Sequence, residues 1–383
     1  MNKVLLKTLS IVLALLCFAP ISSCDRNNVT NPPTDTPQNE DKEEIHMTDY
    51  SKKNVNLNQN TQGIKILGVR NLKSSAVINA DWTCSGIEFY ADCEGELSLK
   101  VMSEKPCYYR AYVDGVPYQN GNTPYFTVEG TSTIKIQGIE KGKHLFRFIK
   151  VTGYTLANTA LRSISLCGEI CNEAPADNKL YLEFVGDSIC CGWGVLPDAQ
   201  GEYKGTYDCQ DGSLAYPYLI SNDLGADYSI TALSGQGLLC GNPGMTLGYK
   251  YACYGKNPDT AYGFERKANA VIINIGTNDY SQQEKLGIDS DDFLRSYSSL
   301  ISYIREVNGS DCKIILVYNV MNDTFSNAVR QAAKDAGGES AGVFVYMAKR
   351  TSRERGNSHP SINENKKYAE DIGAYIKQIL NIN

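Results

Sequence analysis

The chain has 383 residues, of which 42% are apolar and 21% are charged, and its formal net charge is −6. This composition is typical of a globular protein, and the length allows two or three domains of about 100–200 residues each. The mild negative charge, and a sequence without a basic stripe interleaved with aromatic residues, argue against nucleic acid as a partner.

The first 24 residues have the pattern of an export signal. Lys3 and Lys7 form a basic start, a short apolar run follows, and residues 21–24 read Ile-Ser-Ser-Cys. The run is short for a spanning helix and leads into small residues, as in a cleaved signal peptide. Because Ile-Ser-Ser-Cys resembles a bacterial lipobox, we expect a lipid on Cys24 and an exported lipoprotein, anchored in the periplasm or at the cell surface. An uncleaved membrane anchor is the alternative.

Residues 25–50 are rich in Asn, Pro, Thr and acidic residues and contain almost no apolar side chain. Such a segment cannot bury a core, so we expect a disordered, solvated tether.

Thirteen cysteines occur in the chain, and eleven remain once Cys17 leaves with the signal and Cys24 carries lipid. None belongs to a Cys-x-x-Cys pair and His is scarce, so we expect no metal site and no cofactor. An exported compartment permits disulfides, and Cys167 and Cys171 are close enough in sequence to pair. An odd number leaves at least one free thiol.

Residues 51–173 have the pattern of an all-β domain. Short segments of alternating polarity recur, separated by turn signals at Asp114-Gly115, at Asn120-Gly121 and at residues 141–143, Lys-Gly-Lys. Several short strands at this spacing predict a β-sandwich or jelly roll.

Residues 178–383 have the pattern of an α/β domain. Apolar segments predict parallel strands at residues 180–185, 228–230, 271–275, 313–318 and 343–346, and the last three are near-continuous runs, as in strands covered on both faces. Apolar stripes at helical spacing lie between and after them, and the last one is preceded by Ser361-x-x-Glu364, a capping-box pattern. Alternating strands and helices predict a three-layer domain with a parallel sheet.

Histidine occurs at only three positions, 46, 144 and 359. Serine ester hydrolysis needs a base that takes the proton of the nucleophile near neutral pH and returns it to the leaving group. Only His359 lies in the α/β region, whereas His144 lies in an alternating strand where we expect it to pack. His359 is therefore the candidate general base.

Ser188 is the candidate nucleophile. It ends Gly186-Asp187-Ser188 directly after the first apolar strand, at the carboxyl end where open α/β sheets bind ligands. Cys190 stands where the Gly-x-Ser-x-Gly elbow of α/β-hydrolases has its second glycine, and Gly-Asp-Ser alone is also a common turn.

Two further loops at the same predicted sheet edge favour catalysis. Gly235 follows the second strand in Leu-Ser-Gly-Gln-Gly, and Asn278 follows the third in Gly-Thr-Asn-Asp. An oxyanion hole needs main-chain N–H groups and often an amide side chain. We expect the N–H groups of Ser188 and Gly235 and the Asn278 amide to form one.

The four segments that contain Ser188, Gly235, Asn278 and His359 resemble, in this order, the four blocks of the SGNH (GDSL) hydrolases. The resemblance implies a flavodoxin-like three-layer fold, a serine carboxylic ester hydrolase with Ser188 as nucleophile and His359 as base, and an oxyanion hole of Ser188, Gly235 and Asn278. With the preceding β domain, the chain is most similar to carbohydrate esterase family two. That resemblance implies an acetylesterase acting on acetylated poly- or oligosaccharides such as xylan and glucomannan.

The chain departs from the SGNH pattern at the triad acid, because Gly356 occupies the usual aspartate position three residues before His359. The resemblance to family two therefore implies a Ser–His dyad with the imidazole oriented by a main-chain carbonyl, and Glu354 or an acid distant in the sequence is the alternative partner. We expect Asp187 and Asp279 to hold their loops rather than to act in the reaction.

Two aromatic residues are candidates for substrate contact. Trp193 follows Ser188 closely, and core packing is the equally weighted alternative for it. Tyr262 precedes the third strand, where family two tends to carry a tryptophan. Two alternative functions remain: a catalytically weak carbohydrate-binding surface lipoprotein, which the Gly356 departure favours, and a general aryl or lipid esterase, which the lack of a long apolar lid segment disfavours.

Overall fold

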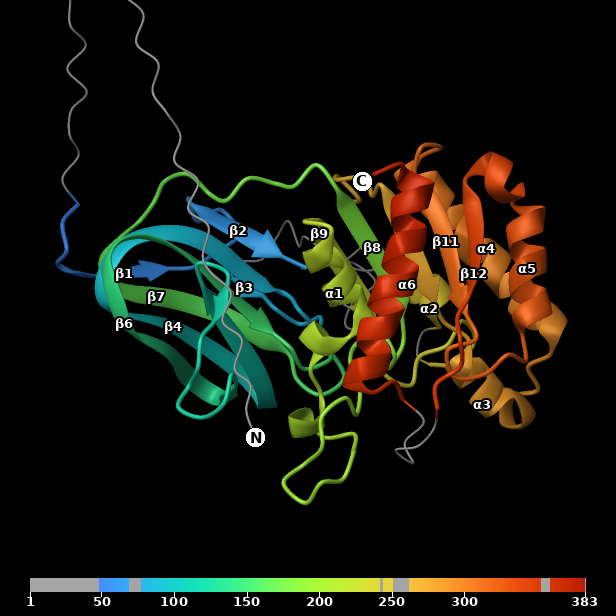
Figure 1. Cartoon of the computed structure of the whole chain (residues 1–383), viewed down its shortest axis with the longest axis horizontal. Helices are drawn as coiled ribbons and strands as arrows, with labels where there is room; N and C mark the ends of the chain where they lie inside the picture. Colours follow the sequence, from blue (N-terminus) through green and yellow to red (C-terminus); the bar gives the residue numbers. More distant parts are fainter. Residues whose placement is uncertain (1–47, 69–76, 242–243, 251–261, 353–358, 383) are drawn as a thin grey trace, which may run out of the picture. The chain divides into compact units, whose positions relative to one another are not determined.

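The computed structural model describes residues 48–68, 77–241, 244–250, 262–352 and 359–382 (Figure 1). The predicted signal segment, Cys24, His46 and most of the predicted tether lie outside these residues, as do Glu354 and Gly356. Thr48–Asn383 form one compact unit. Within the described ranges, no helix has both the length and the apolar character needed to cross a membrane.

The first half of the described chain forms a seven-stranded sheet in which every pairing is antiparallel. Its strands are β1 (Lys52–Asn56), β2 (Ile64–Leu67), β3 (Ile78–Asn79), β4 (Gly86–Val113), β5 (Val116–Pro117), β6 (Phe126–Lys150) and β7 (Thr159–Ile170). Both ends of β4 pair with the end of β6, since Phe146 lies opposite both Phe89 and Val113. The sheet therefore curls around its own core of alternating buried side chains.

The predicted short strands are fused into long ones. The turn at Asp114-Gly115 is present between β4 and β5, with positive φ at both residues. The predicted turn at residues 141–143 is wrong, because Gly142 lies inside β6 opposite Cys93. Irregular register near Cys93 and Gly95 lets β4 continue where the sequence pattern indicates an interruption.

The second half forms a five-stranded parallel sheet, which confirms the predicted α/β domain. Its order is β12-β11-β10-β8-β9. The strands are β8 (Tyr181–Gly186), β9 (Asp227–Ala232), β10 (Ala270–Asn274), β11 (Lys313–Tyr318) and β12 (Val343–Met347). Every residue of β8 and β10 is buried, as near-continuous apolar strands require.

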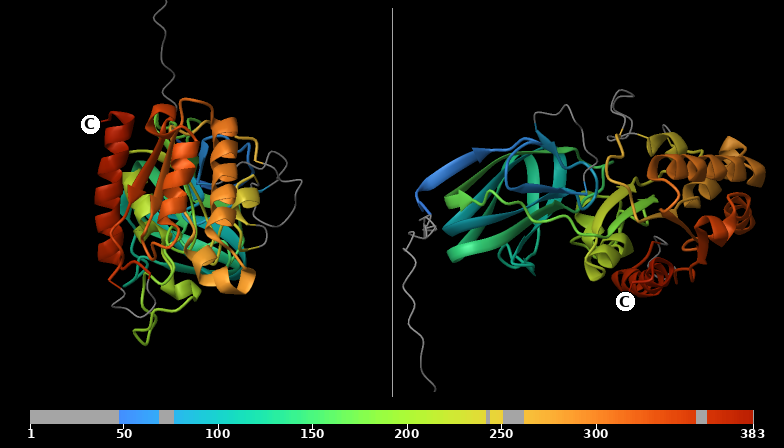
Figure 2. Two further views of the ribbon diagram at one scale, coloured as in Figure 1. Left: turned by 90° about the vertical axis from the view of Figure 1, so that its right-hand side faces the viewer. Right: turned by 90° about the horizontal axis from the view of Figure 1, so that it is seen from above.

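Helices cover both faces of this sheet (Figure 2). The α-helices are α1 (Tyr216–Asp223), α2 (Met245–Gly248), α3 (Thr277–Leu286), α4 (Ser290–Asn308), α5 (Ser326–Asp335) and α6 (Ile362–Leu380). Helices α4 and α5 share one apolar cluster with the sheet, and α1 and α6 share another. The capping box predicted for the last helix is present, with the Ser361 and Glu364 side chains each bonded to the other's main-chain N–H.

The register of the parallel strands places three loops side by side. Gly186, at the end of β8, lies opposite both Ala232 of β9 and Asn274 of β10. The segments that begin at residues 187, 233 and 275 therefore leave the sheet at one edge, its carboxyl edge, where ligands of such sheets bind.

Candidate active site

Ser188 and His359 meet at the carboxyl edge. The Ser188 Oγ lies 2.8 Å from the Nε2 of His359, although the two residues are 171 positions apart in the chain. Ser188 lies two residues beyond β8 and is 5% exposed, and His359 lies three residues before α6 and is half-buried. A general base must lie within hydrogen-bond reach of the proton that it takes, and this pair satisfies that requirement.

The turn that carries Ser188 is held by Asp187. Its main-chain carbonyl accepts hydrogen bonds from the N–H groups of Cys190 (3.1 Å) and Cys191 (3.2 Å), and its Oδ1 accepts one from Ile189 (2.9 Å). A Cβ on Gly186 would collide with the Cys190 side chain, so a glycine is required where the strand meets the turn. The structural role predicted for Asp187 is therefore confirmed.

Asp279 ties the start of α3 to the loop that follows Gly235. Its carboxylate accepts hydrogen bonds from the main-chain N–H groups of Leu238 (2.8 Å), Leu239 (2.8 Å) and Cys240 (3.3 Å). From the sequence, Asp279 is expected to hold only its own loop, which contains Asn278. The structure shows that it also holds residues 238–240. The two oxyanion segments are joined by this carboxylate.

Asn278 lies between the segments that carry Ser188 and Gly235. Its Nδ2 donates to the carbonyl of Gln236 (2.8 Å) and lies 3.3 Å from Oδ2 of Asp187, so it touches the neighbours of both Gly235 and Ser188. Gly235 has φ of +81°, and the space where a Cβ would lie is open. An open, glycine-lined surface beside an amide donor is what a developing oxyanion needs.

Asp187 is fully buried, and this burial, reinforced by the nearby Asp279, raises its pKa to about 7. A raised pKa means that the stability contributed by the protonated group is fully present below about pH 4 and is lost as the pH rises through about 7. Asp187→Asn keeps a neutral side chain at every pH. We therefore expect the free energy of unfolding of the wild type to fall by roughly 1–3 kcal/mol more than that of the variant between pH 4 and pH 8.

Urea unfolding at a series of pH values measures this difference. Asp335→Asn, at the exposed end of α5, is the control for the loss of one negative charge. Parallel pH curves for the wild type and Asp187→Asn would contradict the raised pKa of Asp187.

Three side chains that support the dyad were missed from the sequence. The Tyr216 hydroxyl accepts a hydrogen bond from Nδ2 of Asn274 (3.1 Å) and lies 3.2 Å from the Cys190 sulfur. Asn365 accepts a hydrogen bond from the Tyr216 N–H (3.0 Å) and donates to the carbonyl of Pro360 (3.2 Å). One signal was available, since Asn274 is the only polar residue of β10.

Trp193 lies on the turn after Ser188, and its main-chain N–H donates to the Ser188 carbonyl (3.1 Å). The ring is half-buried, packs beside a core cluster, and lies so close to Gly205 that a Cβ there would collide with it. Part of the ring therefore serves core packing, the second of the two roles weighed for it.

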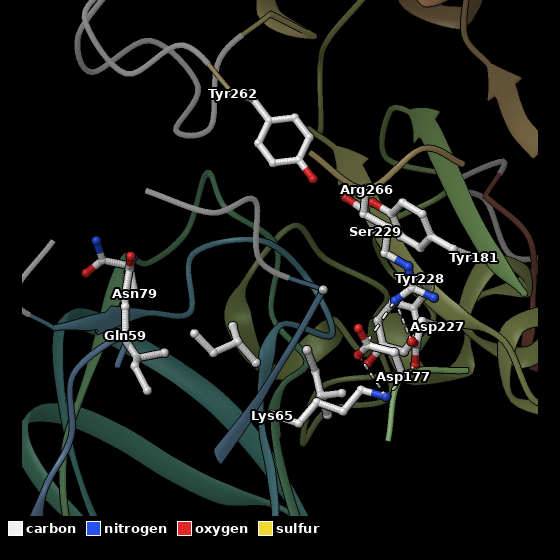
Figure 3. Close-up of a pocket in the computed structure, with 14 residues that line it drawn as sticks. Gln59, Lys65, Asn79, Asp177, Tyr181, Asp227, Tyr228, Ser229, Tyr262 and Arg266 are labelled. Carbon is white, nitrogen blue, oxygen red and sulfur yellow. Dashed lines mark hydrogen bonds and ion pairs between the residues drawn. The ribbon is translucent and has the colours of Figure 1, made fainter. Parts of the chain in front are cut away.

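Tyr262 is the other aromatic candidate for substrate contact, and Ser188 is not among the residues that line its pocket. It lines a pocket of about 210 Å³ together with Lys65, Tyr181, Asp227 and Arg266 (Figure 3). Tyr181 and Asp227 are the first residues of β8 and β9, so this pocket lies at the amino edge of the parallel sheet, opposite the edge that carries Ser188. A residue that directly precedes a parallel strand lies at that strand's amino end.

The remaining predicted groups lie apart from the dyad. His144 packs in the antiparallel sheet as expected, with Nδ1 2.7 Å from Asp114. All ten cysteines in the described ranges are free thiols, so the pairing that the spacing of Cys167 and Cys171 permits is not formed. The described ranges contain no group of three His, Cys, Asp or Glu side chains able to hold a metal ion.

Comparison with known proteins places this geometry in a family. Residues 184–361 match the model of the GDSL-like lipase/acylhydrolase family. The cellulase/esterase CelE of Acetivibrio thermocellus is 27% identical over 317 residues, which cover 78% of this chain and 37% of CelE. An acetylxylan esterase/glucomannan deacetylase of Cellvibrio japonicus is 23% identical over 262 residues, or 63% of this chain and 71% of that protein.

Solved structures show the same relationship over more of the chain. A family two carbohydrate esterase from Clostridium thermocellum, solved with cellohexaose, is 26% identical, has a TM-score of 0.75, and covers 83% of this chain and 99% of that one. A family two carbohydrate esterase from Cellvibrio japonicus shares the fold at 16% identity and a TM-score of 0.74, covering 88% of this chain and 99% of that one. Residues 184–361 therefore form a GDSL-type (SGNH) lipase/acylhydrolase domain, and the chain is homologous to the family two carbohydrate esterases.

Proposed function

We propose that this protein is a serine esterase that removes acetyl groups from poly- or oligosaccharides. The observation that carries the proposal is the 2.8 Å contact between Ser188 Oγ and His359 Nε2 at the carboxyl edge of the sheet. The grouping of Gly235 and Asn278 beside this pair supports an acyl-transfer reaction, because such donors stabilise a tetrahedral oxyanion.

The residues suggest the following sequence of steps. His359 takes the hydroxyl proton as Ser188 Oγ attacks the acetyl carbonyl carbon, and the carbonyl oxygen becomes an oxyanion. The N–H groups of Ser188 and Gly235 and the amide of Asn278 stabilise that charge. His359 then gives the proton to the sugar oxygen as the carbon–oxygen bond of the ester breaks. Water, deprotonated by His359, hydrolyses the acetyl–Ser188 ester and restores the free enzyme.

Acetylated plant-type polysaccharide is the proposed substrate class. The chain spans 37% of the length of CelE, and the relatives include an acetylxylan esterase/glucomannan deacetylase and a family two esterase solved with cellohexaose. These names describe those proteins, and they support a glycan with a β-linked backbone as the substrate here.

Acetate release from acetylated xylan, acetylated glucomannan and positional isomers of acetylated hexoses tests the proposal. We expect release from at least one polysaccharide, and covalent labelling of Ser188 by a fluorophosphonate probe. Glycan binding without acetate release or labelling would instead support a binding lipoprotein. Faster cleavage of long-chain aryl or lipid esters than of acetylated glycans would support a general esterase.

We also propose that the protein is exported and held to a membrane by a lipid on Cys24, with residues 25–50 as the tether. Lys3, Lys7 and the Ile-Ser-Ser-Cys sequence support this location. We further propose that residues 51–173 are a jelly-roll domain and residues 178–383 the catalytic domain. Cell fractionation tests the anchor, since Cys24→Ala should move the protein from the membrane fraction to the soluble fraction.

A further inference from the structure

A buried carboxylate joins the antiparallel sheet to the segment that follows Ser188. Asp211 is fully buried, and its carboxylate accepts hydrogen bonds from the Tyr125 hydroxyl (2.8 Å) and from the Ser213 N–H (2.8 Å) and Oγ (2.6 Å). The Arg110 Nη1 lies 3.4 Å from the same carboxylate and donates to Ser213 Oγ at 2.8 Å. Arg110 belongs to β4, and Tyr125 lies directly before β6.

The positive charge of Arg110 offsets part of the free-energy cost of burying the Asp211 carboxylate. Burial raises the pKa of Asp211, and Arg110 acts in the opposite direction. The guanidinium carbon of Arg110 lies 5.6 Å and 5.8 Å from the ring centres of Tyr112 and Tyr125, so the aromatic rings fix the position of the cation. Removing one partner of a buried ion pair leaves an uncompensated charge and is strongly destabilising locally.

Asp211 contacts the turn of the nucleophile. Its main-chain N–H donates to the carbonyl of Gly192 (3.4 Å), and a Cβ on Gly192 would collide with the Asp211 carbonyl oxygen. Gly192 adjoins Trp193, whose N–H donates to the carbonyl of Ser188. Asp211 is therefore connected through Gly192 and Trp193 to the turn that carries the nucleophile.

Asp211 also lies at the start of a path to the general base. Its side chain caps the short helix η2 (Gly212–Leu214), and α1 begins two residues later at Tyr216. The Tyr216 N–H donates to Asn365, and Asn365 donates to the carbonyl of Pro360, the residue after His359. The segment from Asp211 to Tyr216 thus contacts the Ser188 turn through Gly192 and is linked to the His359 loop through Asn365.

We propose that Arg110 and Tyr125 are positioning residues for the Ser188–His359 pair and act through Asp211. This inference rests on the proposed esterase function. It gives the antiparallel sheet a part in catalysis, although neither residue touches the dyad. Because a misplacement of about 1 Å can cost about 100-fold in rate, a loosened Asp211 is expected to lower kcat more than it changes KM.

Full-length variants test the proposal on an acetylated glycan. We expect Tyr125→Phe, which removes one hydroxyl, to lower kcat about 10-fold and Arg110→Met to lower it about 100-fold, each with KM within about twofold of the wild type. Fluorophosphonate labelling of Ser188 should slow in parallel. Arg110→Lys should recover part of kcat, because a cation again pairs with the Asp211 carboxylate. The double variant Arg110→Met/Asp211→Asn should also recover part of it, because the buried side chain is then neutral.

Lys65→Met is the matched control. Lys65 forms a buried ion pair with Asp227 (2.8 Å) at the amino edge of the parallel sheet, where Arg266 also pairs with Asp227 (2.6 Å), so this variant should lose some stability and keep its kcat. A kcat in folded Tyr125→Phe and Arg110→Met equal to that of Lys65→Met would overturn the proposal. If Arg110→Met does not fold, Tyr125→Phe decides the outcome.

Crystal structures of the variants separate this inference from the proposed function. We expect the Ser188 Oγ–His359 Nε2 distance to exceed 3.5 Å, beyond hydrogen-bond range, in Arg110→Met, and an unchanged distance would contradict the positioning role. A wild type that releases no acetate from any ester would remove the esterase proposal, whereas the Ser188–His359 distance would still report whether Arg110 acts on the dyad through Asp211.

Discussion

Ser188→Ala is expected to abolish acetate release, lowering kcat by roughly four to six orders of magnitude, as loss of a nucleophile that works with a paired base does. The substitution removes the hydroxyl that is proposed to form the acyl-enzyme and that lies 2.8 Å from His359 Nε2. The oxyanion donors and the substrate contacts remain, so residual catalysis from them alone is expected.

The same variant should remain folded and should still bind glycan. Ser188 Oγ forms a single hydrogen bond in the described part of the chain, and losing one such bond costs about 1 kcal/mol. Ser221→Ala is the matched control, because Ser221 is a fully buried serine of α1 whose hydroxyl donates to the carbonyl of Pro217. The control should keep full activity and full probe labelling.

Acetate release by Ser188→Ala above one hundredth of the wild-type rate would sink the assignment of the nucleophile. The labelled peptide identifies the alternative, since a fluorophosphonate adduct on another residue would locate it directly. Retained glycan binding with no turnover is the expected result.

The α/β half was predictable because its parallel strands are covered on both faces. That coverage forces near-continuous apolar runs, such as the fully buried β8 and β10, and these runs are readable without tertiary information. The end of each apolar run also predicts where its strand ends. The carboxyl ends of parallel neighbours coincide, so the segments carrying Ser188, Gly235 and Asn278 had to meet at one edge.

The antiparallel half was less predictable because local turn chemistry competes with long-range pairing. Gly142 resembles a turn residue in the sequence, yet its pairing with Cys93 keeps it inside β6. The side-chain contacts between the antiparallel and the α/β halves have no signature in the local sequence. Arg110 and Asp211 are 101 residues apart, and only the folded chain shows that they touch.

The position of Tyr262 could not be predicted from its residue type. An aromatic residue shortly before a parallel strand has the composition of a sugar-binding wall, but it lies at the amino edge with Asp227 and Arg266. Ligands of open α/β sheets bind beyond the carboxyl ends of the strands, which is the edge that carries Ser188.

His359→Ala is the second change expected to have a very large effect, with kcat lowered by roughly four to six orders of magnitude. The nucleophile and base act as one unit, so the double variant Ser188→Ala/His359→Ala should be no less active than either single variant. His144→Ala is the matched control, because His144 pairs with Asp114 in the antiparallel sheet, and it should keep its kcat.

Fluorophosphonate labelling distinguishes the roles of the two residues. Ser188→Ala should give no adduct, since the attacked atom is gone. His359→Ala should still give an adduct on Ser188, but more slowly, because the hydroxyl remains and only its base is lost. A His359→Ala variant that labels at the wild-type rate and keeps more than one tenth of the wild-type kcat would place the general base elsewhere. In that case the 2.8 Å contact would only help to hold the loop before α6 against the nucleophile turn.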